Sequence, residues 1–266
     1  MNSLPICATC GMQYAAPRSD CPICEDERQY VPLSGQQWTD LDTLRANHTG
    51  LLREEGPGVL GVGCEPAFAI GQRALLVSAR SGNFLWDCFA CLDDEIVAKI
   101  NELGGLTGIS ISHPHFYSTV VEWAHAFDVP VYLHEKDREW LGRPESSVEW
   151  WSGETKQVAK DLTLINLGVH FPGGTVLHWP EGENGKGALL SGDIVKVIPD
   201  RKFVSFMYSY PNLIPERPSV VRRAAEILAG YEFEAIYSAW WDSIVRTDGH
   251  EVVQRSAKRY LDFVSS

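Results

Sequence analysis

The sequence predicts an α/β sandwich in which two central β-sheets lie between outer layers of helices. Short β-rich runs, separated by Gly and Pro turn signals, recur in both halves of the chain. Each strand-rich half also contains segments whose apolar residues repeat with helical spacing. The 266 residues are 44% hydrophobic and 22% charged. That composition allows a substantial core, as expected for one large domain with or without a small appendage.

The first half is predicted to alternate strands with short helices. Strands are expected at residues 59–63, 67–71, 74–79, 83–88, 107–112 and 130–134. Helices are expected at residues 39–46, 93–103, 119–127 and 136–141. Asp93 can cap the second of these helices, whose apolar residues fall on one face.

The second half repeats this style with longer strands. Strands are expected at residues 161–168, 174–180, 187–193 and 233–241, and glycines mark several of the turns between them. A long aromatic loop is expected at residues 201–215, between the third and fourth of these strands. Helices are expected at residues 218–229 and 251–264, and the latter has one apolar face.

The charge balance restricts the partners that we expect. Acidic residues outnumber basic ones by 35 to 23, for a formal net charge of -12, which argues against nucleic acid as the main partner. No apolar run reaches the roughly 18 residues of a transmembrane helix. The N-terminus has neither the basic start nor the apolar stretch of a signal peptide. We therefore expect a cytoplasmic protein that acts on a small molecule, without a membrane partner, and an oligomer remains open.

Four cysteines near the N-terminus predict a metal site. CATC and CPIC are two Cys-x2-Cys pairs, and their thiolates can form a tetrahedral sulfur shell: Cys7, Cys10, Cys21 and Cys24. Residues 1–30 are too few to bury a core, so metal binding would supply most of the folding energy of this ribbon. We expect zinc, with a rubredoxin-like iron centre as the competitor. Residues 31–56 are interpreted as a polar linker.

The other three cysteines are predicted to be buried thiols. Cys64, Cys88 and Cys91 lie in apolar or strand-like segments, and an odd cysteine count without an export signal does not favour a disulfide framework. Cys88 and Cys91 have Cys-x2-Cys spacing but lack a partner pair.

Three histidines and an aspartate follow predicted strands and are candidates for a second metal site. His113 and His115 lie in SHPH, His170 lies in GVHFPGG, and Asp193 ends LLSGD. Ligands in the loops after strands can converge on one edge of a sandwich, where a rigid scaffold holds them at metal-binding distance.

The order of these motifs resembles the metallo-β-lactamase superfold over about residues 57–266. That family has a His-x-His-x-Asp-His motif, then a His before a Gly-rich turn, then a strand ending in Gly-Asp, and a final His. The resemblance implies an αββα sandwich, a domain at residues 57–266 and metal ligation by the three histidines and Asp193. Tyr117 and Ser118 replace the family's Asp-His, and Trp240 stands at the last His. All three departures fall on the second-metal subsite, so the sequence resembles a site reduced to one metal.

The resemblance also implies roles around that metal. Three neutral imidazoles and a water make a competent catalytic zinc site. Asp193 is expected to be a fourth ligand or to accept a proton from the water, and Tyr117 to donate to a developing oxyanion. We expect four residues to line the substrate pocket: Ser118, Tyr208, Trp240 and Trp241.

Three functions are compatible with the sequence. The first is a hydrolase with a single catalytic metal, about two zinc ions per chain including the ribbon, and an ester, lactone, thioester or amide as substrate. The second is a non-catalytic ligand-binding or regulatory protein, suggested by the altered second subsite. The third is a redox protein with iron in either site, by analogy with flavodiiron and persulfide-oxidising relatives of the fold.

Overall fold

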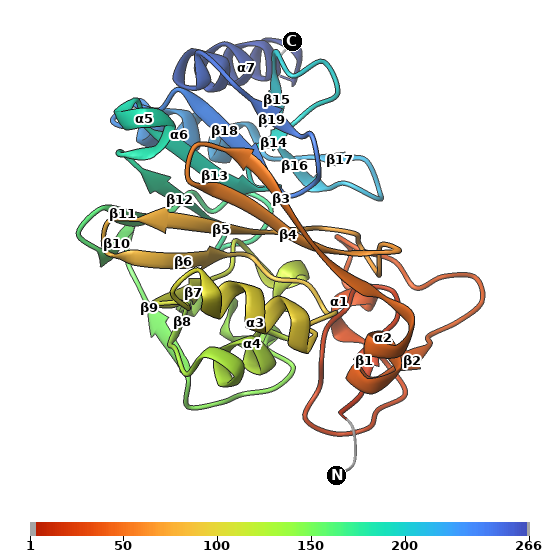
Figure 1. Ribbon diagram of the computed structural model, residues 1–266. Coiled ribbons are helices and arrows are strands. Elements are labelled where there is room, and N and C mark those ends of the chain that lie inside the picture. The colour runs from red at the N-terminus through yellow and green to blue at the C-terminus, as the bar shows by residue number, and fades with distance from the viewer. Residues whose placement is uncertain (1–3, 265–266) are drawn as a thin grey trace.

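Two mixed β-sheets pack face to face in the computed structural model, which describes residues 4–264 (Figure 1). The seven-stranded sheet has the strand order β3 (Thr49–Gly56), β4 (Val59–Glu65), β5 (Ala74–Ala79), β6 (Gly82–Trp86), β7 (Gly108–Ser110), β8 (Val131–His134), β9 (Val148–Trp151). The six-stranded sheet has the order β10 (Thr155–Ala159), β11 (Leu162–Asn166), β12 (Thr175–Trp179), β13 (Ala188–Gly192), β18 (Ala235–Ser238), β19 (Ile244–Val245).

Helices cover the outer face of each sheet. α3 (Asp94–Glu102) and α4 (Val120–Phe127) pack on the larger sheet, and α6 (Pro218–Leu228) and α7 (Gly249–Val264) pack on the smaller one (Figure 1). The remaining helices are short: α1 (Pro22–Glu25), α2 (Leu41–Asn47), α5 (Gly182–Gly185) and the 3-10 helices η1 (Pro114–Phe116) and η2 (Glu135–Trp140). The predicted αββα sandwich is confirmed.

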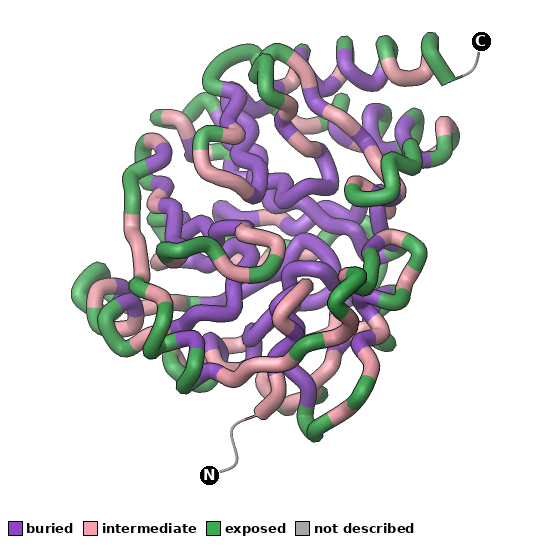
Figure 2. Tube along the Cα trace, turned by 90° about the vertical axis from the view of Figure 1, so that its right-hand side faces the viewer, coloured by how far each residue is buried: buried purple, intermediate pink, exposed green. Residues whose placement is uncertain are grey.

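Apolar side chains fill three layers of core. Trp86 and Leu177 lie in the cluster between the sheets, Trp123 lies under the helices of the larger sheet, and Val253 lies under those of the smaller sheet. Figure 2 shows the buried residues running through the central strands, with exposed residues on outer loops and helix faces. Each such side chain contributes about 1.5 to 3 kcal/mol by leaving water.

A small N-terminal module stands beside the sandwich (Figure 1). Its two-stranded sheet pairs β1 (Ile6–Cys7) with β2 (Trp38–Thr39), and α1 carries the second cysteine pair, with Cys21 as its N-cap and Cys24 within it. Buried residues of the module, among them Ile6 and Ile23, belong to the same core cluster as the helices of the larger sheet.

The larger sheet begins before residue 57. β3 is its edge strand and pairs antiparallel with β4, with Leu52 opposite Val62. The segment interpreted as a polar linker, residues 31–56, therefore contains both α2 and β3. β3 is mostly polar because an edge strand can face water, which hides the alternation that identifies a strand.

The prediction of a strand at residues 67–71 is wrong, because this segment forms a turn. Ala69 and Gly71 have φ of 52° and 74°, and the Gly71 N–H donates to the Phe68 carbonyl at 2.9 Å. A turn with left-handed backbone cannot continue a strand, although its residues are apolar.

The aromatic loop at residues 201–215 is more ordered than its sequence predicts. It contains β15 (Val204–Ser205), β16 (Met207–Ser209) and β17 (Ile214–Pro215), and β15 pairs with β14 (Lys196–Val197). β14 contacts β18, and β15 contacts α7, where the Val204 N–H donates to Ser256 Oγ, so the segment packs against the smaller sheet and its outer helix. Among residues 4–264, no helix has both the length and the apolar composition needed to cross a bilayer.

Candidate metal centres

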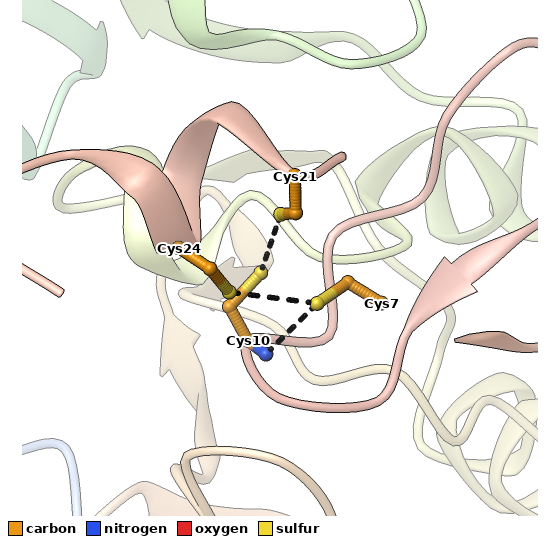
Figure 3. Close-up of side chains that lie close together, drawn as sticks. All are labelled: Cys7, Cys10, Cys21 and Cys24. Atoms are coloured by element: carbon orange, nitrogen blue, oxygen red, sulfur yellow. Dashed lines mark hydrogen bonds between the residues drawn. The ribbon is translucent and has the colours of Figure 1, made fainter. Parts of the chain in front are cut away.

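Four cysteine thiols converge in the N-terminal module (Figure 3). The Sγ atoms of Cys7 and Cys24 lie 3.6 Å apart, and those of Cys10 and Cys21 are separated by the same 3.6 Å. A tetrahedral zinc ion with Zn–S bonds of about 2.3 Å separates its sulfurs by about 3.8 Å. The four-cysteine site expected from the spacing is therefore formed, and its dimensions fit zinc.

Polar groups around the sulfurs favour the thiolate form. The backbone N–H groups of Thr9 and Cys10 each donate to Cys7 Sγ at 3.4 Å, and Gln36 Nε2 donates to it at 3.1 Å. Tyr14 Oη lies 3.2 Å from Cys21 Sγ. Such donors stabilise negative sulfur and orient it, as the outer shell of a metal site does.

Three buried histidines form a second cluster where the two sheets meet. His113 is the N-cap of η1 and His115 lies within that helix, immediately after β7, whereas His170 lies in the loop between β11 and β12. The ligand nitrogens of the three rings all lie within 4.8 Å of one another. The structure thus brings together the three histidines that the motifs identified.

Hydrogen bonds fix two of these rings. Ser112 Oγ lies 2.9 Å from His113 Nδ1, and His170 Nδ1 donates to the Tyr208 carbonyl at 2.8 Å. Both contacts leave Nε2 as the nitrogen that can bind a metal. The His170 backbone has φ of 67°, and the Glu216 carboxylate holds it by accepting the His170 N–H at 2.8 Å.

The free nitrogens have the spacing of metal ligands. His170 Nε2 and His115 Nδ1 lie 3.1 Å apart, close to the roughly 3.3 Å between two nitrogens of a tetrahedral zinc ion with Zn–N bonds of about 2.0 Å. Burial lowers the pKa of all three imidazoles, which keeps them in the neutral form that binds metals. Within residues 4–264, His113 Nε2 is buried with no hydrogen-bond partner. The residues present therefore fit a metal ion.

Asp193 lies at the side of this cluster. Its Oδ1 is 3.3 Å from His113 Nε2 and has no hydrogen-bond partner within the described residues. The group whose ligand atoms are all mutually close contains the three histidines but not Asp193. Burial raises the pKa of the Asp193 carboxyl, which makes its ionised form a stronger proton acceptor.

A cavity of about 150 Å³ opens beside the histidines. Its lining includes His115, His170 and Asp193 together with Lys196, Tyr210 and Trp240. Lys196 Nζ lies 4.0 Å from the centre of the Trp240 ring and 4.3 Å from that of Tyr210. These ring faces stabilise the ammonium ion, while burial alone lowers its pKa. The cavity thus combines a candidate metal centre with a partly buried lysine.

The other predicted pocket residues are spread over different surroundings. Tyr208 borders a different cleft, whose lining also includes His170, and Trp241 lies against the guanidinium groups of Arg53 and Arg73. Ser118 is buried and its Oγ donates to the Gly11 carbonyl in the N-terminal module. Of the four residues predicted to line the pocket, this cavity contains Trp240.

Tyr117 is packed in the core of the larger sheet. Burial raises the pKa of its phenol well above the usual value, and among residues 4–264 no hydrogen bond links its Oη to the three histidines. Its expected action on an oxyanion stays a prediction.

The sequence analysis did not identify Lys196 or Asp87 as residues of the site. Lys196 follows Asp193 by three residues, and this short spacing is the one feature of the sequence that places Lys196 near the site. Asp87 is buried behind the site with φ of 61°, and its Oδ1 accepts the Ser112 N–H at 2.7 Å. Burial raises the pKa of Asp87 to about 7. Asp87 positions Ser112, which in turn contacts His113.

Comparison with known proteins gives one close relative and many similar folds. No protein-family model matches the chain. YmaE of Bacillus subtilis (strain 168), an uncharacterized protein, is 48% identical over 266 residues, which cover 98% of this chain and 97% of YmaE. The solved structure of VMB-1 has a TM-score of 0.60 at 15% identity and covers 81% of this chain and 98% of its own.

Two further solved structures show the same fold. DIM-1 metallo-β-lactamase has a TM-score of 0.57 at 15% identity and covers 79% of this chain and 97% of its own. A metallo-β-lactamase from Cronobacter sakazakii has a TM-score of 0.52 at 17% identity and covers 80% of this chain and 96% of its own. At these identities the likeness shows the fold.

Proposed function

Because the chain belongs to the same family as YmaE and has the metallo-β-lactamase fold, we propose that it is a hydrolase with a single catalytic metal ion. The substrate is a small ester, lactone, thioester or amide. The observation that carries the proposal is the cluster of three neutral, buried imidazoles beside a carboxylate and a cavity. Among the described residues, Nε2 of His113 and Nε2 of His115 have no hydrogen-bond partner.

Each residue of the cluster has a chemical role. His113, His115 and His170 would hold the metal ion. A bound zinc ion would polarise the substrate carbonyl and lower the pKa of a water to about 7. Asp193 orients the attacking water and accepts its proton, because its carboxylate is desolvated and adjacent to His113.

Other residues of the cavity lining select the substrate. Lys196 supplies a partly buried positive charge held against two aromatic rings, so it favours a substrate with a carboxylate or another anionic group. Trp240 and Tyr210 present apolar faces to the rest of the molecule. A cavity of about 150 Å³ accommodates a small reacting group rather than a large one.

Contacts at the altered subsite support the use of one metal. Ser118 stands at a position where the resemblance has a second-metal histidine, and it is bonded to Gly11 of the N-terminal module. Trp240 stands at the other such position, and its ring contacts Phe116 and Lys196. Neither side chain offers a metal ligand in this arrangement, so a second ion has too few donors.

The test is metal analysis and turnover of wild type beside His113→Ala and His115→Gln. Each variant is expected to bind one metal ion fewer per chain and to lose hydrolysis of an ester, lactone, thioester and amide panel by at least about 100-fold. His125→Ala is the matched control, since His125 is a half-exposed histidine paired with Glu145. Unchanged metal content in both variants, or wild-type protein with metal but no metal-dependent turnover, contradicts the proposal.

A further inference from the structure

A third cluster of metal-ligand side chains lies outside both centres described above. A ring nitrogen of His48 and the sulfurs of Cys64 and Cys91 all lie within 4.8 Å of one another. His48 and Cys64 are partly exposed, Cys91 is buried, and both cysteines are free thiols. The three residues come from separate segments: the end of α2, the end of β4 and the loop before α3.

The His48 ring is held in an orientation that leaves one nitrogen free. Nδ1 lies 2.7 Å from the Pro66 carbonyl, to which it donates, so Nε2 is the nitrogen with a lone pair for a metal. An edge-on contact with Phe68, at 5.6 Å between ring centres, fixes the ring further. A histidine that donates its other N–H to a backbone carbonyl is the usual arrangement of a metal ligand.

The position of Cys64 is set by strand register. Cys64 lies opposite Gly50 in the β3–β4 pair, and the Gly50 N–H donates to Asp93 Oδ2 at 2.9 Å. A Cβ on Gly50 would lie 2.4 Å from the Ile96 side chain, so the backbone of β3 packs directly against α3 and leaves no room for a larger residue. These contacts hold the strand that carries Cys64 against the segment that carries Cys91.

The loop that carries Cys91 is held on both sides. Thr119 Oγ1 donates to the Phe89 and Ala90 carbonyls, and Arg45 Nε donates to the Leu92 carbonyl at 2.9 Å. Arg45 belongs to α2, whose C-cap is His48. The same hydrogen bond therefore ties the loop to the helix that supplies the imidazole.

We propose that His48, Cys64 and Cys91 bind one zinc ion. Two thiolates and one imidazole are a donor set that zinc prefers, and the rigid frame holds them close together before any ion arrives. A cavity of about 20 Å³ borders Cys64, Phe68 and Ala90, which is room for one water. With water as the fourth ligand, the ion reaches tetrahedral coordination and clamps α2, the β3–β4 hairpin and the loop before α3 together.

The test counts zinc in the full chain, reduced, loaded with Zn²⁺ and freed of excess metal by gel filtration. His48→Gln, Cys64→Ser and Cys91→Ser are each expected to bind one zinc ion fewer per chain than wild type. His125→Gln, another partly exposed histidine, is the control and is expected to keep the wild-type count. His113→Ala in the same series measures zinc binding at the histidine centre separately. If that centre binds no zinc, the zinc count of His48→Gln still tests the third site.

A second measurement does not depend on stability. Zn²⁺ is expected to slow alkylation of Cys64 in wild type, as followed by peptide mass spectrometry, and to leave it unchanged in His48→Gln. A zinc count that is the same in wild type and all three variants overturns the proposal. A Cys64–Cys91 disulfide whose reduction yields thiols that take up no zinc overturns it as well.

Discussion

Lys196 is the residue with the clearest predicted effect on substrate choice. Its ammonium group lies over two aromatic rings and within a cavity that also contains Asp193. Lys196→Met keeps the length of the side chain and removes the charge. Because a hydrogen bond to a charged group contributes about 1.5 to 3 kcal/mol, KM for anionic substrates is expected to rise roughly 10- to 100-fold. Steady-state kinetics with matched anionic and neutral substrates checks this, and an equal effect on both classes contradicts it.

Asp137 is a buried carboxyl under the turn that follows His170. Its Oδ1 accepts the Gly173 N–H at 2.8 Å, and its Oδ2 is buried with no hydrogen-bond partner in the described part of the chain. A Cβ on Gly173 would lie 2.4 Å from Asp137 Oδ2, so only glycine fits there. Burial raises the pKa of Asp137 to about 7, against the weaker opposite effects of the Gly173 N–H and Arg28.

The folded protein therefore binds a proton at Asp137 more tightly than the unfolded chain, whose Asp pKa is about 3.9. The contribution of Asp137 to the free energy of unfolding should be largest below pH 4, fall between about pH 4 and pH 7, and then level off. The full change is at most on the order of 4 kcal/mol. Asp137→Asn keeps the Gly173 bond and abolishes this dependence. Urea unfolding at pH 5 and 8 should show the variant gaining on wild type as the pH rises, and a constant difference contradicts the interpretation.

At the scale of elements, the predictable parts are those with a local signal. α2 and α3 begin after Asp40 and Asp93, whose side chains accept backbone N–H groups three residues on, as capping residues do. Strands of the sandwich interior were predicted because both faces are buried and their sequences are nearly all apolar. β3 was missed because an edge strand lacks that pattern, and the turn at residues 67–71 was mistaken for a strand because its residues are apolar.

The candidate site residues also differ in whether a local sequence signal identifies them. His113, His115, His170 and Asp193 were predictable because each follows a strand within a few residues, in motifs with a known order. The cluster of His48, Cys64 and Cys91 was not, because strand register and a helix end bring it together. Cys91 was expected to be an inert buried thiol, and spacing along the chain carries no information about the imidazole that lies beside it.

At the scale of the whole molecule, the N-terminal module is part of the site wall. The backbone N–H of Gln13 donates to the Ser118 carbonyl at 3.1 Å. The side-chain Nδ2 of Asn212 donates to the Gln29 carbonyl at 3.0 Å. Gln29 also lines the cavity beside the histidines. No sequence pattern links the module to these segments, because the two partners of each hydrogen bond are more than 100 residues apart along the chain. The four-cysteine site therefore stabilises a surface that encloses the candidate catalytic centre.

Removing one of the four cysteine thiolates is expected to unfold the N-terminal module while the sandwich stays folded. Cys10→Ser leaves three thiolates, and structural zinc supplies about 10 kcal/mol or more to a small module. The variant should lose one metal ion per chain, become susceptible to limited proteolysis within residues 4–40, and lose most of its kcat/KM. The metal that depends on His113 should remain, because the core between the two sheets and the core under α6 and α7 contain no residue of the module.

Gln36→Ala is the matched control for this experiment. It removes one N–H···S contact to Cys7 and leaves all four thiolates, so metal content and protease resistance should stay near wild type. If Cys10→Ser instead remains as protease-resistant and as active as wild type, the module does not depend on its metal for docking. If the metal ion that depends on His113 is lost together with the ion of the four cysteines, the module and the sandwich unfold as one unit, because the contacts of Ser118, Glu122 and Asn212 with the module couple them.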